Sequence, residues 1–223
     1  MQLTPGWNAI YLQVAPESDA PADVFASLLD ASGPRIESVW TWLAQPNRIE
    51  FVQDQTTEGL LRQPGWLRYF PATDERSFLT NLFAIPGNRA YLVKLDGAAT
   101  ELTVTGKPLA PSDDWEPSAF NFTGFHVDPA APPSFADFLA PAPALAPSAV
   151  RGARKIFGLS ADGTTWQAID PLTTLVEPGR AYWIWSEGGN DYSGPLAVEL
   201  PPGGRFAYGA GLDDLISRVQ NQG

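Results

Sequence analysis

Apolar and polar residues alternate over short stretches along most of this chain, and proline or glycine bounds nearly every stretch. A period of two predicts β-strands that bury one face, and the prolines and glycines predict turns between them. The predicted strands form two successive sets, residues 6–16, 36–43, 65–71, 82–95 and 100–108, then residues 119–129, 153–160, 165–171, 174–186 and 194–202. The alternation therefore predicts an all-β protein.

Apolar residues have helical spacing in three places. Residues 21–29 and 133–140 each carry a proline near the first turn, which favours a short helix. In the second of these, Ser134 and Asp137 are predicted to form a capping pair. Residues 212–220 are predicted to form a C-terminal helix, which either packs on the second half of the chain or serves as an interaction helix. Its apolar face consists of Leu212, Leu215, Ile216 and Val219.

The two halves of the chain repeat the same order of elements. The first half opens with GWNAIYLQVAP and the second with AFNFTGFHVDP, and the most similar pair is PGNRAYLVKL against PGRAYWIWS. A shared order over several elements indicates duplication. We therefore predict two tandem small β-sandwich or barrel-like domains, each with one short α-helix. The predicted boundaries are 1–110 for the first domain, 111–118 for a proline-rich linker, 119–205 for the second domain and 206–223 for the C-terminal helical segment.

These motifs resemble a β-repeat of large exported bacterial proteins. In that repeat a "pGWN" strand opens the unit, and a "pGxaYWv" strand followed by a "vtvxG" strand closes it. The opening motif matches Gly6, Trp7 and Asn8 in the first half, whereas Phe120 replaces the tryptophan in the second half. The resemblance covers most of the chain. It implies an exported modular β protein without an established activity, and it carries over no catalytic residue.

Charge and composition exclude several classes of function. The 223 residues carry a formal net charge of −11, with 14 basic and 25 acidic residues, which disfavours binding to nucleic acid. The chain has no cysteine and a single histidine, so neither a thiol nucleophile nor a zinc site is expected, and we predict no metal and no cofactor. No apolar run reaches the length of a membrane span.

Candidate catalytic groups are few. His126 is the only side chain that could serve as the base of a Ser-His-Asp triad, and the alternation places it on the polar face of its strand. The adjacent carboxyl groups of Asp113 and Asp114 lie in the predicted linker, where a solvated turn is the simplest interpretation. The glycine-rich segment 187–194 is interpreted as a turn rather than a calcium loop. We therefore predict that the protein is not an enzyme.

The aromatic residues are the remaining candidates for binding. Tyr182 has a counterpart in Tyr91, so the scaffold explains it, whereas Trp183 and Trp185 stand where the first half has Leu92 and Lys94. These two tryptophans, together with Trp42, are the candidate ligand-binding residues. Exposed tryptophan faces are typical of sugar-binding modules, and packing between the two repeats is the competing interpretation.

The sequence therefore favours a non-enzymatic structural or protein-interaction module of an exported or surface-associated bacterial protein. The alternative is a carbohydrate-binding module that uses the exposed tryptophans of the second repeat. A protein partner or self-association is expected, and a glycan is the alternative ligand. The expected location is outside the cytoplasm, with a signal peptide missing from this sequence, and the alternative is a cytoplasmic protein.

Overall fold

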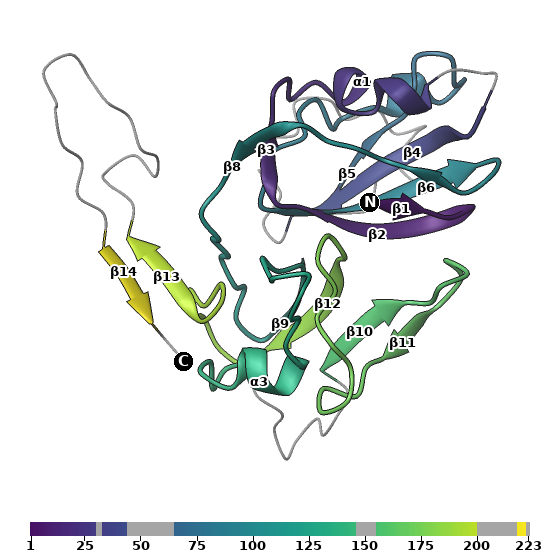
Figure 1. The fold of residues 1–223 in the computed structure, drawn as a ribbon. Coiled ribbons are helices and arrows are strands. Elements are labelled where there is room, and N and C mark those ends of the chain that lie inside the picture. Colours follow the sequence, from purple (N-terminus) through teal and green to yellow (C-terminus); the bar gives the residue numbers. More distant parts are fainter. Residues whose placement is uncertain (30–32, 44–64, 146–154, 200–217, 222–223) are drawn as a thin grey trace, which may run out of the picture.

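The computed structural model describes residues 1–29, 33–43, 65–145, 155–199 and 218–221 (Figure 1). Its described residues are mostly strands in several antiparallel sheets, with two short α-helices, which confirms the all-β prediction. Two four-stranded sheets, one from each half of the chain, form the body of the molecule. The strands of both sheets overlap the ranges that the alternating pattern predicts, because alternate residues point to opposite faces of a sheet, but several are shorter than predicted.

The first sheet consists of β2 (Gly6–Leu12), β4 (Arg35–Trp42), β5 (Trp66–Tyr69) and β6 (Arg89–Asp96). Its spatial order is β2-β6-β4-β5. The first strand of this half therefore pairs with the fourth, the fourth with the second, and the second with the third. All of these pairs are antiparallel.

The second sheet consists of β9 (Ala119–Thr123), β10 (Ile156–Leu159), β11 (Trp166–Ala168) and β12 (Tyr182–Ser186). Its order, β11-β10-β12-β9, is the order of the first sheet when the strands of each half are counted separately. The register agrees as well. Asn8 lies opposite Val93 in the first sheet, and Asn121 lies opposite Ile184 in the second.

Those two asparagines make the same hydrogen bonds. The Asn8 Oδ1 accepts from the Thr4 N–H at 2.8 Å, and its Nδ2 donates to the Thr4 carbonyl at 2.8 Å. The Asn121 Oδ1 accepts from the Glu116 N–H at 2.8 Å, and its Nδ2 donates to the Glu116 carbonyl at 3.2 Å. Each asparagine therefore ties the loop before a sheet's first strand to that strand, which explains why both halves carry asparagine there.

Two-stranded ladders complete the described strands. They pair β1 (Gln2–Leu3) with β7 (Thr100–Glu101), β3 (Val14–Pro16) with β8 (Gly106–Pro108), and β13 (Leu196–Glu199) with β14 (Arg218–Asn221). The single strand predicted over 100–108 is thus divided between two ladders, with β7 in one and β8 in the other.

The predicted C-terminal helix is wrong at its described end. Arg218–Asn221 is a strand, β14, that pairs with β13 in register from Glu199 opposite Arg218. Residues 212–217 lie outside the residues that the structure describes. Apolar residues at a helical period of 3.6 favour a helix only weakly in so short a segment. Here the segment pairs with the edge of β13 and forms a strand instead.

The helices are shorter than the apolar spacing predicts. The first is α1 (Pro21–Val24), which continues as a 3-10 turn over Ala26–Leu28, and a second 3-10 turn covers Ser77–Leu79. The other is α3 (Phe135–Leu139). The Ser134 hydroxyl accepts a hydrogen bond from the Asp137 N–H at 3.1 Å, which confirms the predicted cap.

The molecule has four layers, in the order α1, first sheet, second sheet and α3 (Figure 1). One hydrophobic core lies between α1 and the first sheet, and it includes Phe25 and Tyr91. Another lies between α3 and the second sheet, and it includes Phe135 and Tyr182. A third apolar cluster joins the two sheets to each other. Tyr91 and Tyr182 are both buried, which confirms their scaffold role.

The predicted linker is part of the second core. The Trp115 side chain is buried there, and its Nε1–H donates to the Tyr192 carbonyl at 2.7 Å. Residues 111–118 therefore do more than connect the two halves. They bring neighbouring polar side chains, Asp113 among them, up against the place where the two sheets meet.

Candidate functional site

The surface between the two sheets, called the sheet junction below, is held by backbone as well as side-chain contacts. The Tyr11 N–H donates to the Gly179 carbonyl at 2.9 Å, and the Ala181 N–H donates to the Ala9 carbonyl at 3.0 Å. Strand β2 is the edge of the first sheet, so the segment that leads into β12 satisfies groups that the edge would otherwise leave open. The small side chains of Ala9, Ala90 and Ala181 permit this close approach.

Tryptophan and phenylalanine rings fill the rest of the sheet junction. Trp183 of the second sheet contacts Trp42 and Trp66 of the first, with ring centroids 5.7 Å and 6.1 Å apart. Phe122 stacks on Trp183 at 4.9 Å and lies 6.1 Å from Trp66. Edge-to-face and stacked pairs of this kind stabilise the fold beyond the contribution from burying apolar surface. The sheet junction is therefore a dense aromatic contact that fixes the two sheets against each other.

This geometry places the three candidate tryptophans in different surroundings. Trp42 and Trp183 contact each other across the sheet junction, so the packing interpretation describes both of them. Trp185 lies two residues further along the same face of β12 and packs on Phe120, with 5.1 Å between ring centroids. The structure therefore brings Trp42 and Trp183 together and places Trp185 against Phe120 of the neighbouring strand β9.

Beyond the sheet junction, the aromatic face of the second sheet is partly exposed in the part of the chain that the structure describes. Phe120, Phe157, Trp166 and Trp183 line a shallow depression of about 370 Å³, called the aromatic groove below. Its lining residues come from all four strands of the second sheet. They offer no polar side-chain atom other than the indole N–H groups, so the aromatic groove suits an apolar occupant.

Cations cover the corresponding face of the first sheet. The Lys94 ammonium lies 5.9 Å from the Trp7 ring and forms an ion pair with Glu37 at 2.7 Å. The Arg68 guanidinium lies 5.5 Å from the Trp40 ring. Both contacts have the geometry of cation–π interactions.

The pairing registers identify the equivalent positions in the second sheet. Lys94 lies opposite Trp7 just as Trp185 lies opposite Phe120. Arg68 lies opposite Trp40 just as Ala168 lies opposite Phe157. The second sheet therefore has a tryptophan and an alanine where the first has two cations.

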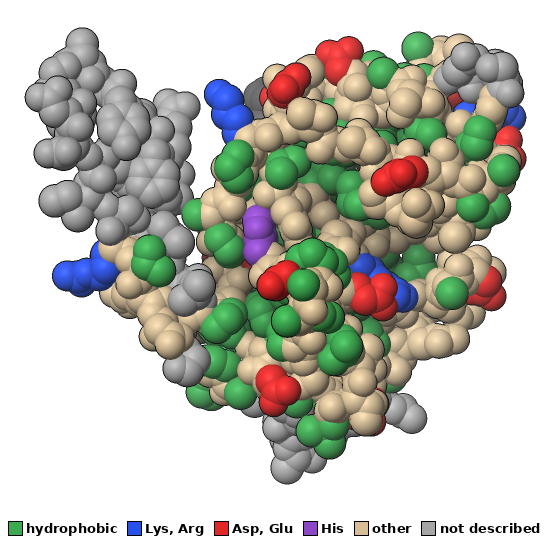
Figure 2. Space-filling view, in the orientation of Figure 1, with side chains coloured by type: hydrophobic (Ala, Val, Ile, Leu, Met, Phe, Trp, Pro, Cys, Tyr) green, Lys and Arg blue, Asp and Glu red, His purple; other side chains and the backbone are tan. Residues whose placement is uncertain are grey.

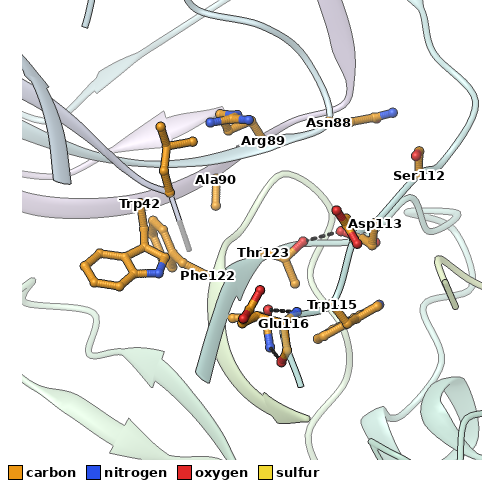
Figure 3. Close-up of a pocket in the computed structure, with 13 residues that line it drawn as sticks. Trp42, Asn88, Arg89, Ala90, Ser112, Asp113, Trp115, Glu116, Phe122 and Thr123 are labelled. Atoms are coloured by element: carbon orange, nitrogen blue, oxygen red, sulfur yellow. Dashed lines mark hydrogen bonds between the residues drawn. The ribbon is translucent and has the colours of Figure 1, made fainter. Parts of the chain in front are cut away.

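A second depression, called the inter-sheet cleft below, lies beside the sheet junction (Figure 3). Its volume is about 480 Å³. It is bounded by the end of β4, the start of β6, residues 112–116 and strand β9. The Trp42 and Phe122 rings lie on one side of it in Figure 3, and Asp113 lies on the other. Ligand sites of proteins commonly combine such a volume with apolar walls and a few polar groups.

Asp113 is the most perturbed carboxyl group in the inter-sheet cleft. The Thr123 hydroxyl donates a hydrogen bond to its Oδ1 at 2.7 Å. Burial raises the pKa of Asp113 from its ordinary value of 3.8 to about 7, although the bond from Thr123 acts in the opposite direction. Burial, with a smaller contribution from the charge of Asp113, also raises the pKa of Tyr11. The solvated turn predicted for this residue is therefore wrong for Asp113, whereas Asp114 is exposed.

His126 also lies where the two halves meet, and its surface is visible in Figure 2. Its Nε2 is 2.7 Å from the Asn88 Oδ1, and its ring lies edge-on to Tyr11 at 5.8 Å. Burial lowers the pKa of His126, so the neutral imidazole is favoured. The contact joins the second half to the first, and it gives His126 an amide partner instead of the carboxylate of a catalytic triad.

The predicted interaction helix is described only at its end, where the chain forms strand β14 (Arg218–Asn221). Leu212, Leu215 and Ile216 lie outside the residues that the structure describes. Val219 is exposed on strand β14. Charged side chains are scattered over the face in Figure 2, and none of its basic side chains gather into a patch.

Among the described residues, no three His, Asp or Glu side chains are placed to hold a metal ion, and no helix is long and apolar enough to cross a membrane. Comparison with protein families, with curated proteins and with solved structures finds no match for this chain. The case for a function therefore depends on the geometry of the aromatic groove and the inter-sheet cleft.

Proposed function

We propose that this protein is a non-enzymatic protein-interaction module of an exported or surface-associated bacterial protein, and that the aromatic groove is its docking surface. The observation that carries this proposal is the difference between the two aromatic faces. The first sheet covers its rings with Lys94 and Arg68, whereas the second presents Trp185 and Ala168 at those positions. Four partly exposed aromatic side chains thereby line a groove beside the sheet junction, and one of them, Trp183, belongs to both.

The proposed occupant is a basic protein segment that presents aliphatic or aromatic side chains. The apolar lining offers few hydrogen-bond partners for the hydroxyl groups of a sugar. It therefore favours an apolar protein segment as the occupant. The net charge of −11 attracts a basic partner over long range and raises its rate of association. Aromatic side chains are also enriched in the buried centres of protein interfaces.

Duplication and export belong to the same proposal. The common strand order, the common register and the equivalent roles of Asn8 and Asn121 support descent of both halves from one repeat. The resemblance of the opening and closing motifs to repeats of exported bacterial proteins supports a location outside the cytoplasm. The rigid sheet junction supports a role as a scaffold that holds a partner rather than as a moving catalytic unit.

The test blocks the aromatic groove with a guanidinium, the group that lies over Trp40 in the first sheet. Ala168→Arg places a guanidinium opposite Phe157, as Arg68 stands opposite Trp40. The matched control is Gln167→Arg, an exposed neighbour on the same strand whose side chain points to the other face. A displayed library of random peptides is selected against the wild type, and the enriched peptides are then titrated against all three proteins.

We expect the selected peptides to combine aromatic or aliphatic residues with flanking lysine or arginine. Their affinity should fall at least tenfold with Ala168→Arg and stay within about twofold with Gln167→Arg. Equal binding to all three proteins would refute the aromatic groove as the docking surface. A panel of oligosaccharides titrated in the same assay tests the carbohydrate-binding alternative, and a sugar whose binding Ala168→Arg abolishes would replace the protein partner by a glycan.

A further inference from the structure

We propose that the inter-sheet cleft binds an organic ammonium ion, whose charge lies against the Asp113 carboxylate and whose alkyl groups contact Trp42 and Phe122. This site is separate from the aromatic groove and does not depend on the proposed function. Its residues come from both halves of the chain and from the segment between them, so the site exists only when the two sheets are assembled.

The walls of the inter-sheet cleft combine two aromatic rings with a carboxylate. Trp42 and Phe122 line one side of the inter-sheet cleft, and Asp113, bonded to Thr123, lines the other (Figure 3). Both rings also contact Trp183 at the sheet junction, at 5.7 Å and 4.9 Å, so their positions are fixed before any ligand arrives. An aromatic face and a carboxylate that are held in place attract the same kind of ligand, a cation with apolar substituents.

A further argument is the missing counter-ion of Asp113. Among the described residues, no basic side chain forms an ion pair with it, and it accepts a hydrogen bond from the neutral hydroxyl of Thr123 at 2.7 Å. A partly buried carboxylate without a cation is costly, and this one responds by holding its proton to a higher pH than usual. A cation in the inter-sheet cleft would supply the missing charge and release that proton.

The other charges around the inter-sheet cleft favour the same sign of ligand. Arg89 at the start of β6 lines it and is the basic residue of the lining, whereas Asp114 and Glu116 add two acidic residues to Asp113. Of the titratable groups near Asp113, Tyr11 on β2 stays neutral because burial raises its pKa. His126, after β9, favours its neutral form because burial lowers its pKa. With Asp113 ionised, the surroundings are net negative.

The donor set favours an organic cation over a metal ion. Divalent metals in proteins need several oxygen or nitrogen ligands at short range. The described residues place no group of three or more His, Asp or Glu side chains around a common point. A single carboxylate beside two aromatic rings instead fits an ammonium group that carries methyl or alkyl substituents.

The experiment uses tetramethylammonium as the probe and neopentyl alcohol as an uncharged ligand of similar size and shape. Each is titrated into the full chain at constant ionic strength, and the indole N–H signals are followed by NMR. We expect saturable shifts with tetramethylammonium at pH 8 and no saturable shift with neopentyl alcohol. Because binding needs the ionised carboxyl group, the affinity should fall roughly a hundredfold between pH 8 and pH 5.

The decisive variant is Asp113→Asn, which keeps a carbonyl oxygen to accept from Thr123 and removes the charge. It should weaken tetramethylammonium binding at least tenfold. The control is Asp19→Asn, which makes the same change of net charge at an exposed position away from the inter-sheet cleft, and its affinity should stay within about twofold. Ala168→Arg should leave the binding unchanged, which separates this proposal from the proposed function.

Three results would overturn the proposal. The first is the absence of any saturable shift with tetramethylammonium up to 100 mM, on the order of the weakest affinities that a specific site shows. The second is equal binding of the charged and the uncharged probe, which would leave only an apolar pocket. The third is an Asp113→Asn variant that folds as the wild type does and binds tetramethylammonium as well.

Discussion

The two sheets share a strand order and a register, yet they treat their aromatic faces differently. In the first sheet, Lys94 and Arg68 lie over Trp7 and Trp40, and Glu37 holds the lysine in place. In the second sheet the same positions leave the aromatic groove. The two halves therefore share a strand order but differ at these positions, because cations lie over the rings of one sheet and a depression lies over the rings of the other.

The difference shows that an aromatic residue in a repeat has to be judged by its neighbours on the adjacent strands. Trp7 and Phe120 are equivalent in register, and both are partly buried. A lysine opposite the first and a tryptophan opposite the second give them different environments. A long cationic side chain can cover an aromatic face with its methylene groups and keep its charge in water.

The largest expected effect follows from removing the ring that links the two sheets. Trp183→Ala deletes the contacts with Trp42, Trp66 and Phe122 and should lower the free energy of unfolding by about 3 kcal/mol. Trp185→Ala, which removes a ring that packs on Phe120 within the second sheet, should cost about half as much. Chemical denaturation followed by circular dichroism measures both variants.

The ranking of these two variants is the informative result. If Trp183→Ala is as stable as the wild type and loses ligand binding, then Trp183 is a binding residue and the packing interpretation is wrong. If Trp185→Ala is the more damaging variant, the sheet junction does not fix the two sheets in the way described above.

The second prediction tests whether Asn8 and Asn121 stabilise the two halves to the same extent. Asn8→Ala and Asn121→Ala each leave two backbone groups of the preceding loop without their side-chain partner. Each should therefore lower the free energy of unfolding by about 1 to 3 kcal/mol, and the two losses should agree within about 1 kcal/mol. Chemical denaturation of the two single variants tests this. A neutral result for one asparagine alone would break the equivalence of the two halves.

Much of the fold follows from the sequence, because strand alternation and the order of the motifs act locally. The strands and the Ser134 cap could be predicted from neighbours within a few residues, and the buried Tyr91 and Tyr182 from the matching motifs of the two halves. The C-terminal segment was mispredicted because the strand Arg218–Asn221 depends on an edge about twenty residues earlier in the chain. A window of helical spacing contains no information about that edge.

The candidate site was only partly predictable for the same reason. The comparison of repeats singled out Trp183 and Trp185, but their neighbours Trp42 and Phe120 come from strands that are distant in sequence. The sequence predicts a solvated linker residue at Asp113 because it stands in an acidic pair between prolines. Its burial follows from Trp115 entering the second core and drawing the segment against β9.

The third prediction concerns the pH dependence of stability. Because the pKa of Asp113 is raised to about 7 in the folded chain, the folded state binds more protons than the unfolded state between about pH 4 and pH 7. This group's contribution to stability is therefore complete below pH 4 and declines as the pH rises to 7. Asp113→Asn should remove this decline and raise the free energy of unfolding at pH 8 by about 1 kcal/mol. This figure is smaller than the pKa shift alone implies because water in the inter-sheet cleft screens the charge.

Denaturation of the wild type and Asp113→Asn at several pH values measures this difference. Other titrating groups, His126 among them, contribute equally to both proteins and cancel in the comparison. The two curves should converge near pH 4 and separate as the pH rises. A constant offset at all pH values would mean that the Asp113 carboxyl group keeps its ordinary pKa.

The smallest expected change in stability comes from converting the first sheet's covered face into an open one. Lys94→Trp copies Trp185 into the equivalent position and breaks the exposed ion pair with Glu37, which should change the free energy of unfolding by less than about 1 kcal/mol. The uncovered Trp7 and Trp40 rings should then bind the fluorescent dye anilinonaphthalene sulfonate more strongly. Lys107→Trp, at an exposed position of β8, is the control for adding a tryptophan to the surface. If both variants bind the dye equally, the cation opposite Trp7 is not what distinguishes the two faces, and the open face of the second sheet needs another cause.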